Sequence, residues 1–445
     1  MSASLRLERP SQPIRAVLRP PGSKSLSNRA LLLAAMAEGR TRIEGCLDAE
    51  DTRLMLDCLA RLGIAVEQTG DAIEDGLELE GSARLGSRSG VIELNVGTAG
   101  TVARFLTAAL AAAREPAWES VVIDGSARMR ERPMDTLLSA LEQLGASVEA
   151  LGKPGALPVR LRAAAGMRGG RLVLDRPASS QFVSALLYAG CLASGPIEIV
   201  LREGTPARPY VDMTLATIAS FGGNAYWAPS GGHFVADGER LIVEPTTLRA
   251  RPTYVVEPDA SAASYLLALP AIWGGEVTIT ELGSASLQGD AEFVRTLERF
   301  GAEVEQGRTH TTVRGTGRLR GQTLELGDMP DTTLTAAVIA LFCEGPTRIT
   351  GVEVLRHHES DRLAASATEL RKLGAEVHEL PDGLEITPPV GGPRPGIAID
   401  TYQDHRMAMA FAMIGDVVIN DPRCVDKTFP NYFEVLARLG IRTVS

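Results

Sequence analysis

Six copies of one pattern recur along the chain: an apolar, helix-like run ends in Leu-Gly or Phe-Gly and is followed by a short strand-like stretch. Glycine ends a helix with little strain, because it takes the left-handed conformation without a Cβ clash. Six copies in constant order predict a tandem repeat. The marker glycines, 66 to 82 residues apart, are Gly63, Gly145, Gly222, Gly301, Gly374 and Gly440.

A second helix-like run precedes each of these, and it is apolar on almost every side and opened by small polar residues. A helix that is apolar nearly all round belongs in a core. We therefore expect each repeat to hold a buried helix, a surface helix and intervening strands; the alternative is an ordinary α/β periodicity. The six buried segments are 23–39, 97–113, 179–195, 259–275, 329–345 and 404–415.

Length and composition favour two domains. The 445 residues divide into six repeats, which fall naturally into two groups of three. Hydrophobic residues make up 44% of the chain but aromatic residues only 4%. The interior is therefore expected to consist of Ala, Leu and Val in close helix–sheet packing.

Several functional classes are disfavoured. Segment 1–17 has no apolar stretch typical of a signal peptide, and no apolar run approaches the length of a membrane span, so a cytoplasmic protein is expected. A net charge of −10 opposes nonspecific binding to nucleic acid or anionic membranes. The five cysteines form no CxxC pair and no HExxH occurs, so neither a disulfide frame nor a metal site is predicted. PGSKS lacks the spacing of a phosphate-binding loop, so no nucleotide cofactor is predicted.

The placement of basic residues is more informative than their number, because an anionic ligand must be met locally. Several lie beside the start of a predicted buried helix, where free N–H groups and the helix dipole favour an anion. Gly100 and segment 179–181 offer the same geometry. The alternative is that each arginine is a solvated surface residue. The basic residues are Lys24, Arg29, Arg104, Arg128, Arg130, Arg132, Arg362, Arg406 and Lys427.

Asp331 and Glu359 are the candidates for acid–base chemistry. Asp331 opens the fifth buried segment, and Glu359 is predicted to open the surface helix of the same repeat. The alternative for both is a helix-capping role. Glu359 has the stronger claim to chemistry, because His358 and Arg362 are expected to share a helix face with it. His405 is a further candidate ligand, although a histidine at a helix start more often satisfies a local hydrogen bond.

Nine motifs in this order carry a resemblance: PPGSKSLSNRALLLAA, AGTVARFL, GSARMRERPM, SSQF, RPYVDMT, MPDTTLT, HESDRL, DHRMAMA and DKTFPNYFE. Over nearly the whole chain they resemble the 5-enolpyruvylshikimate-3-phosphate synthase family. The resemblance implies an α/β (α+β) fold, a two-domain inside-out α/β barrel of six βαβαββ repeats, three per domain. The N-terminal domain is expected at 22–253 and the C-terminal domain at 1–21 and 254–445, with the first strand, near 3–19, in the latter.

The family moves the enolpyruvyl group of phosphoenolpyruvate to the 5-hydroxyl of shikimate 3-phosphate and releases phosphate, in aromatic amino-acid biosynthesis. The resemblance therefore implies these two small molecules as partners, no nucleic acid or membrane partner, no cofactor and a monomer. Each substrate carries a carboxylate and a phosphate. Such ligands suit a site lined by lysines, arginines and helix N-termini.

The resemblance also implies roles for individual residues. Asp331 takes the 5-hydroxyl proton, Glu359 protonates the methylene carbon, and Lys24 reaches both substrates. The implied shikimate 3-phosphate ligands are Lys24, Ser25, Arg29, Ser179, Ser180, Gln181, Tyr210, Asp331 and His358. The implied phosphoenolpyruvate ligands are Lys24, Gly100, Arg128, Gln181, Arg362, Arg406 and Lys427. Glyphosate is expected to compete with phosphoenolpyruvate, because resistant relatives carry Ala in place of Gly100.

Four positions depart from the commonest family pattern. Thr98 replaces an Asn, Ala207 a Ser, Val354 an Asn and His358 a Lys. The last three would normally touch shikimate 3-phosphate. The departures therefore bear on the affinity and ligand set for that substrate and leave the reaction class intact.

Three alternatives share parts of this pattern. UDP-N-acetylglucosamine enolpyruvyl transferase has the same architecture but typically uses a loop cysteine, and no cysteine here lies in an arginine-rich loop between the first two repeats. RNA terminal phosphate cyclases use related units, but the acidic balance of the chain opposes that function. A non-catalytic ligand-binding paralogue is compatible with Ala207 and His358.

Overall fold

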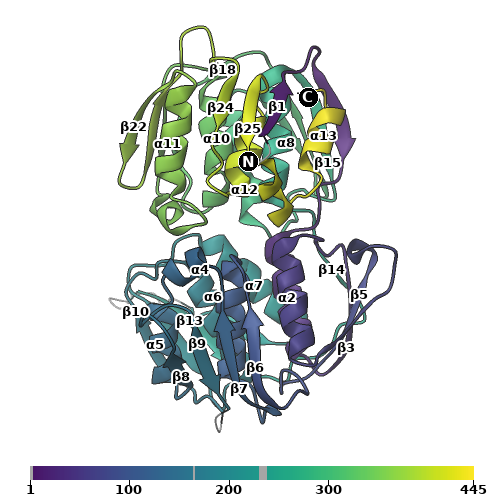
Figure 1. Ribbon diagram of the computed structural model, residues 1–445, viewed down its shortest axis with the longest axis vertical. Coiled ribbons are helices and arrows are strands. Elements are labelled where there is room, and N and C mark those ends of the chain that lie inside the picture. Colours follow the sequence, from purple (N-terminus) through teal and green to yellow (C-terminus); the bar gives the residue numbers. More distant parts are fainter. Residues whose placement is uncertain (1–3, 164–165, 230–237, 445) are drawn as a thin grey trace. The chain divides into compact units, whose positions relative to one another are not determined.

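The computed structural model describes residues 4–163, 166–229 and 238–444, which form two compact units (Figure 1). Unit 1 holds residues 1–21 and 257–445, and unit 2 holds residues 22–256. The second passage between them falls after Val256 rather than after residue 253. Each unit has its own hydrophobic core.

Unit 2 contains three four-stranded sheets of one topology. In each sheet the first pair of strands is parallel and the other two pairs are antiparallel. In sheet order the strands are β14 (Tyr254–Val255), β3 (Gly39–Glu44), β5 (Leu77–Gly81), β4 (Ala65–Gln68); β6 (Gly90–Asn95), β7 (Trp118–Asp124), β9 (Val159–Arg162), β8 (Ser147–Ala150); and β10 (Gly170–Leu174), β11 (Ile197–Leu201), β13 (Glu239–Glu244), β12 (Asn224–Trp227).

Unit 1 repeats this topology three times, and a small pair, β18 (Leu319–Arg320) with β20 (Cys343–Glu344), is added. In sheet order the strands are β2 (Ile14–Leu18), β15 (Gly275–Thr280), β17 (His310–Arg314), β16 (Glu303–Gln306); β19 (Thr323–Glu325), β21 (Thr347–Thr350), β23 (Gly383–Thr387), β22 (Glu376–Leu380); and β24 (Ile397–Ile399), β25 (Val417–Asn420), β1 (Ser4–Glu8), β26 (Arg442–Val444).

Strands remote in sequence complete three of the six sheets. β2 opens the fourth repeat by pairing parallel to β15, and β1 lies between β25 and β26 in the sixth, where Figure 1 shows its purple ribbon beside yellow β25. β14 opens the first repeat from the far end of unit 2. One strand was expected near residues 3–19, in the C-terminal domain. The segment does belong to the C-terminal repeats, but it forms two strands, β1 and β2, in two different sheets.

Each repeat holds the two predicted helices. The side chains of the first are almost all buried: α1 (Lys24–Met36), α3 (Gly100–Ala111), α6 (Ser180–Leu192), α8 (Ala260–Trp273), α10 (Thr333–Ala340) and α12 (His405–Ala412). The second are α2 (Glu50–Arg61), α5 (Asp135–Gln143), α7 (Arg208–Ser220), α9 (Phe293–Phe300), α11 (Arg362–Lys372) and α13 (Tyr432–Arg438). All six marker glycines have positive φ, between 78° and 114°, which confirms the predicted helix ends.

Among the described residues, no helix combines the length and apolarity needed to cross a membrane, and no group of three His, Cys, Asp or Glu side chains could hold a metal ion. Four of the five cysteines are buried, and Cys424 is half-buried.

Asp290 is a buried carboxyl group in unit 1. It lies in the short 3-10 helix η2 (Gly289–Glu292), is 4% exposed and accepts a hydrogen bond from the Ser261 hydroxyl. Burial, and next the charge of Asp331, raise the pKa of Asp290 to about 7. The folded protein therefore holds this proton more tightly than the unfolded chain, in which an aspartate pKa is about 3.9.

We expect Gly222→Ala to lower the free energy of unfolding by about 1 kcal/mol, through the left-handed backbone alone. Gly222 has φ +78°, and an added Cβ would meet no atom within 4 Å. Gly195→Ala is the matched control, because a Cβ there would lie 3.6 Å from Gly169 in ordinary contact. Urea midpoints followed by circular dichroism measure both. Equal midpoints for the two variants would contradict the strain argument.

We expect Asp290→Asn to stabilise the protein increasingly as the pH rises from about 4 to about 7. A carboxyl whose folded pKa is raised loses stability across that window, because the unfolded chain ionises first, whereas an amide does not titrate. Below pH 4 the two proteins should unfold at similar urea concentrations. Asp426→Asn, at a half-exposed position of the same unit, is the control. A pH-independent difference would show that Asp290 is ionised in the fold.

Candidate active site

Arg362, at the first position of α11, is the centre of a charged cluster in unit 1. Its side chain is only 1% exposed. Its guanidinium donates to Asp331 Oδ1 at 2.9 Å, to Glu359 Oε2 at 3.0 Å and to Asp404 Oδ2 at 2.8 Å. Burial opposes the charge of Arg362, but the carboxylates of Asp404, Glu359 and Asp331 outweigh that effect and hold its pKa above the ordinary value. The cluster therefore contains a permanent buried cation.

Asp404 is the carboxylate that fixes Arg362 most firmly. It is fully buried and accepts from both Nε and Nη2 of Arg362, at 2.8 and 3.1 Å. The same carboxylate caps α12 by accepting from the backbone N–H of Arg406 at 3.0 Å, and the Ser360 hydroxyl donates to it at 3.0 Å. The sequence prediction omitted Asp404. Its signal was an aspartate at the N-cap position of a buried helix.

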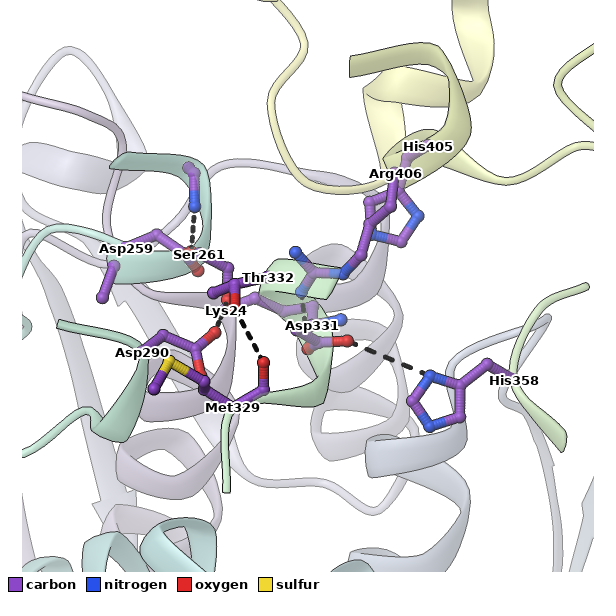
Figure 2. A network of polar contacts seen from close by, with 12 residues as sticks. Lys24, Asp259, Ser261, Asp290, Met329, Asp331, Thr332, His358, His405 and Arg406 are labelled. Carbon is purple, nitrogen blue, oxygen red and sulfur yellow. Dashed lines mark hydrogen bonds and ion pairs between the residues drawn. The ribbon is translucent and has the colours of Figure 1, made fainter. Parts of the chain in front are cut away.

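Asp331 lies between Arg406 and the imidazole of His358, as Figure 2 shows. Arg406 Nη2 donates to Asp331 Oδ2 at 2.6 Å, and its Nη1 lies 3.2 Å from the hydroxyl oxygen of Tyr265. Burial raises the pKa of Tyr265 to about 12, so this hydroxyl stays protonated. Tyr265 is a second contributor that the sequence prediction missed, because nothing local to α8 points to α12.

His358 contacts Arg362 more closely than it contacts the carboxylate of Asp331. Its Nδ1 lies 2.9 Å from Arg362 Nη1 and 3.9 Å from Asp331 Oδ1. A guanidinium only donates hydrogen bonds, so Nδ1 is the acceptor in this contact and the ring proton lies on Nε2. The neutral imidazole therefore has Nε2–H as its hydrogen-bond donor.

Glu359 does not open α11, contrary to the sequence prediction. The helix begins at Arg362 and is capped by Asp361, whose Oδ1 accepts from the backbone N–H of Ala364 at 3.1 Å. An aspartate is short enough to reach back to its own helix, whereas Glu359 lies in the preceding loop. Its Oε1 lies 3.7 Å from Nζ of Lys427, a lysine only 5% exposed.

Asp331 does not act as a helix cap either. It lies inside the 3-10 turn η3 (Pro330–Thr332) that precedes α10, and no side chain caps α10. The capping alternative is therefore wrong for Asp331 as well as for Glu359. Both carboxylates instead accept hydrogen bonds from arginine side chains.

Unit 2 gathers polar groups at the starts of α1 and α7. Lys24 Nζ, at the start of α1, lies 3.7 Å from Oδ2 of buried Asp51. Arg29 is 2% exposed and donates to Thr214 Oγ1 and to the carbonyls of Ser25 and Tyr210, each at 2.9 Å. A guanidinium has five N–H groups, so these bonds leave part of its donor capacity for a ligand.

The starts of α3 and α6 carry a second group of polar side chains in unit 2. Arg104 Nη1 donates to Gln181 Oε1 at 2.8 Å, and Ser179 caps α6 by accepting from the Gln181 backbone at 3.2 Å. A Cβ on Gly100 would lie 2.5 Å from Arg104 Nη1 and 2.8 Å from Arg132 Nη1. Only glycine fits at this position without moving a guanidinium. The sequence prediction named both arginines as basic residues but gave neither a ligand role.

Ser180 and Arg128, two further predicted ligands in unit 2, differ in burial. Ser180 is 6% exposed in the first turn of α6. Arg128, in α4 (Ala127–Glu131), is 40% exposed and forms an ion pair with Glu131 at 2.9 Å. Arg128 thus pairs with an acidic residue of its own helix.

Besides His358, three positions depart from the family pattern, and their settings differ. Ala207 has a left-handed φ of +52° at the N-cap of α7, where its methyl group makes no capping bond. Val354 is 9% exposed in η4 (Glu353–His357). The carbonyl of Thr98 accepts from Arg132 Nη1 at 3.3 Å. His405, which is not one of these departures, is fully buried, and its Nδ1 lies 3.6 Å from Asp404 Oδ1.

The chain matches one family model, described as EPSP synthase (3-phosphoshikimate 1-carboxyvinyltransferase), over residues 8–436. It is 44% identical to the chloroplastic 3-phosphoshikimate 1-carboxyvinyltransferase of Brassica napus, over 96% of this chain and 84% of the relative. It is 41% identical to the 3-phosphoshikimate 1-carboxyvinyltransferase of Vibrio vulnificus, over 96% of this chain and 98% of the relative.

Solved structures show the same fold. EPSP synthase from Acinetobacter baumannii superposes with a TM-score of 0.79 at 23% identity, over 99% of both chains. The enolpyruvyl transferase NikO from Streptomyces tendae superposes with a TM-score of 0.78 at 18% identity, over 100% of this chain and 99% of that one. The family match and the two identities above show that the chain belongs to the EPSP synthase family.

Proposed function

We propose that the chain transfers the enolpyruvyl group of phosphoenolpyruvate to the 5-hydroxyl of shikimate 3-phosphate and releases phosphate, in the shikimate pathway. The observation that carries the proposal is the pair of carboxylates, Asp331 and Glu359, held by one buried guanidinium, that of Arg362. Arg406 and Lys427 add two more cations beside them. The cluster thus combines acid–base groups with the positive charge that a phosphate and carboxylate ligand requires.

The cluster supports a two-step reaction. Glu359 delivers a proton to the methylene carbon of phosphoenolpyruvate, so the adjacent carbon becomes cationic. The 5-hydroxyl oxygen adds to that carbon while Asp331 accepts the hydroxyl proton. Glu359, left as a carboxylate by the first step, takes a proton from the new methyl group, the C=C bond forms again, and the C–O bond to phosphate breaks so that phosphate departs. Arg362, Arg406 and Lys427 offset the negative charge of phosphoenolpyruvate throughout.

Residues of unit 2 and His358 supply the remaining assigned ligands. The assignment to shikimate 3-phosphate is supported by polar groups at the starts of α1, α6 and α7 and by the unused donor capacity of Arg29. Gly100 and Gln181 are assigned to phosphoenolpyruvate. The full proposed set is Lys24, Ser25, Arg29, Gly100, Arg128, Ser179, Ser180, Gln181 and Tyr210.

The proposal includes a cytoplasmic monomer that needs no metal or organic cofactor. Sedimentation equilibrium should give the 47.2 kDa mass of one chain. The decisive assay measures phosphate release with each substrate omitted in turn. Release that requires shikimate 3-phosphate supports the proposal. Release with UDP-N-acetylglucosamine instead, or binding of shikimate 3-phosphate without release, would favour the alternative transferase or a non-catalytic paralogue.

Glu359→Gln should lower kcat by about 100-fold or more, because the amide keeps the shape but cannot donate the catalytic proton. Binding of shikimate 3-phosphate, measured by calorimetry, should change little. The control is Glu385→Gln, which removes a half-exposed carboxylate of β23 that pairs with Arg348. A folded Glu359→Gln protein with near-normal kcat would exclude Glu359 as the proton donor.

Gly100→Ala should weaken inhibition by glyphosate, which is expected to compete with phosphoenolpyruvate. The added methyl group would lie within 3 Å of the guanidinium groups of Arg104 and Arg132 and displace them. Crowding of this size costs about 1–3 kcal/mol, so the inhibition constant should rise about tenfold. Gly222→Ala, at a helix end with open space, should leave inhibition unchanged. An unaltered inhibition constant in Gly100→Ala would remove Gly100 from the site.

A further inference from the structure

The turn that leads into α12 is strained. Tyr402 and Gln403 have φ of +54° and +57°, so two successive residues with side chains adopt the left-handed conformation. L-residues disfavour this conformation, and it persists where surrounding contacts hold it. Asp404, which binds Arg362 and caps α12, follows immediately. The strain therefore lies directly beside the proposed phosphoenolpyruvate site.

Glu369 of α11 holds this turn through two hydrogen bonds from the protein interior. The carboxylate is fully buried. Its Oε1 accepts from the Tyr402 hydroxyl at 2.8 Å, and its Oε2 accepts from the backbone N–H of Asp400 at 3.2 Å. Lys372 Nζ bonds Glu369 Oε2 at 2.8 Å and Asp400 Oδ2 at 2.7 Å, so the carboxylate is compensated.

The other side of the turn is tied to β25. Asn420 donates from Nδ2 to Asp400 Oδ1 at 2.8 Å, and the Thr401 hydroxyl donates to the Asn420 carbonyl at 2.9 Å. The backbone N–H of Asp404 donates to the Thr401 carbonyl at 2.8 Å. Contacts on both sides thus fix the residues that flank Tyr402 and Gln403.

Helix α11 contacts residues 400–404 at two positions, Arg362 and Glu369. Glu369 follows Arg362 by seven residues, which is two helical turns and the same face. Arg362 bonds Asp404, and Glu369 bonds Tyr402 and Asp400. A rigid helix therefore sets the distance between the strained turn and the buried arginine. Arg406, two residues after Asp404, takes its place from the same arrangement.

We propose that Glu369 and Tyr402 are positioning residues, which hold the strained turn so that Asp404 keeps Arg362 and Arg406 in the geometry that binds phosphoenolpyruvate. The identity of that ligand rests on the proposed function. Neither residue touches the reacting atoms. Their loss should therefore act on the affinity for phosphoenolpyruvate and not on the affinity for shikimate 3-phosphate.

The hydroxyl of Tyr402 stays a donor at the pH of the assay. Burial, and next its bond to Glu369, raise the pKa of Tyr402 to about 12. Its effect should therefore be constant between pH 6 and pH 9. A group that acted by proton transfer would instead change the pH profile.

Tyr402→Phe tests the proposal, because it removes one oxygen from a half-exposed side chain and leaves the core intact. The KM for phosphoenolpyruvate should rise about three- to tenfold, with the KM for shikimate 3-phosphate and the pH profile unchanged. Tyr226→Phe is the matched control, because it removes a tyrosine–glutamate bond, to Glu244 at 3.3 Å, in unit 2. An unchanged KM for phosphoenolpyruvate in Tyr402→Phe, or an equal rise in both KM values, would overturn the proposal.

A double variant tests the link to strain. Glycine takes the left-handed conformation freely, so Gln403→Gly added to Tyr402→Phe should lower the KM for phosphoenolpyruvate towards the wild-type value. If the Tyr402 hydroxyl only stabilised the fold, a glycine at position 403 would not restore the KM for phosphoenolpyruvate. A KM that stays raised in the double variant would overturn the role of the turn.

Hydrogen exchange separates this proposal from the proposed function. In the wild-type protein without substrate, the Arg406 amide is bonded to Asp404 Oδ1 and should exchange slowly. Tyr402→Phe should speed exchange of residues 404–407 but not of α8. Faster exchange in a protein that transfers no enolpyruvyl group would refute the proposed function and support the positioning role. Unchanged exchange would refute the positioning role whatever the activity.

Discussion

The bond between Arg362 and Asp404 is the constraint on which the charged cluster of unit 1 depends. Both side chains are almost fully buried, and the carboxylate meets the guanidinium at two atoms. Burial of one such charge alone would cost several kcal/mol, so each group requires the other. The remaining donors of Arg362 then point to Asp331 and Glu359. One compensated pair thus places both proposed acid–base groups.

The two partners of this bond come from helices of different repeats, which are brought together only when the repeats pack. Arg362 begins α11 of the fifth repeat, and Asp404 caps α12 of the sixth. The hydrogen bond between Tyr402 and Glu369 connects the same two repeats at a second point, two helical turns further along α11. The strained turn between β24 and α12 is tolerated because these contacts hold it from α11 and β25. Catalytic groups on helix starts therefore depend on packing between neighbouring repeats.

Sequence reasoning singled out Asp331 and several basic residues because they stand near predicted helix starts, and the resemblance to the family supplied their roles. Asp331, Arg362 and Arg406 were each visible in this way. Tyr265 and Glu369 were not, because each lies inside a helix, where an apolar or surface position has no distinguishing signal. Glu359 was assigned to the wrong element, since Asp361 competes for the cap and is shorter.

The sequence by itself determined the six repeats, their twelve principal helices and the glycines that end six of them. These features depend on hydrophobic periodicity and on the conformational freedom of glycine, which act over a few residues. Only the tertiary structure decided which strands complete which sheets. β1, β2 and β14 join partners from distant parts of their units, and no local pattern names those partners. The left-handed turn at Tyr402 and Gln403 is of the same kind, because its strain is offset only by contacts that exist once the repeats have packed.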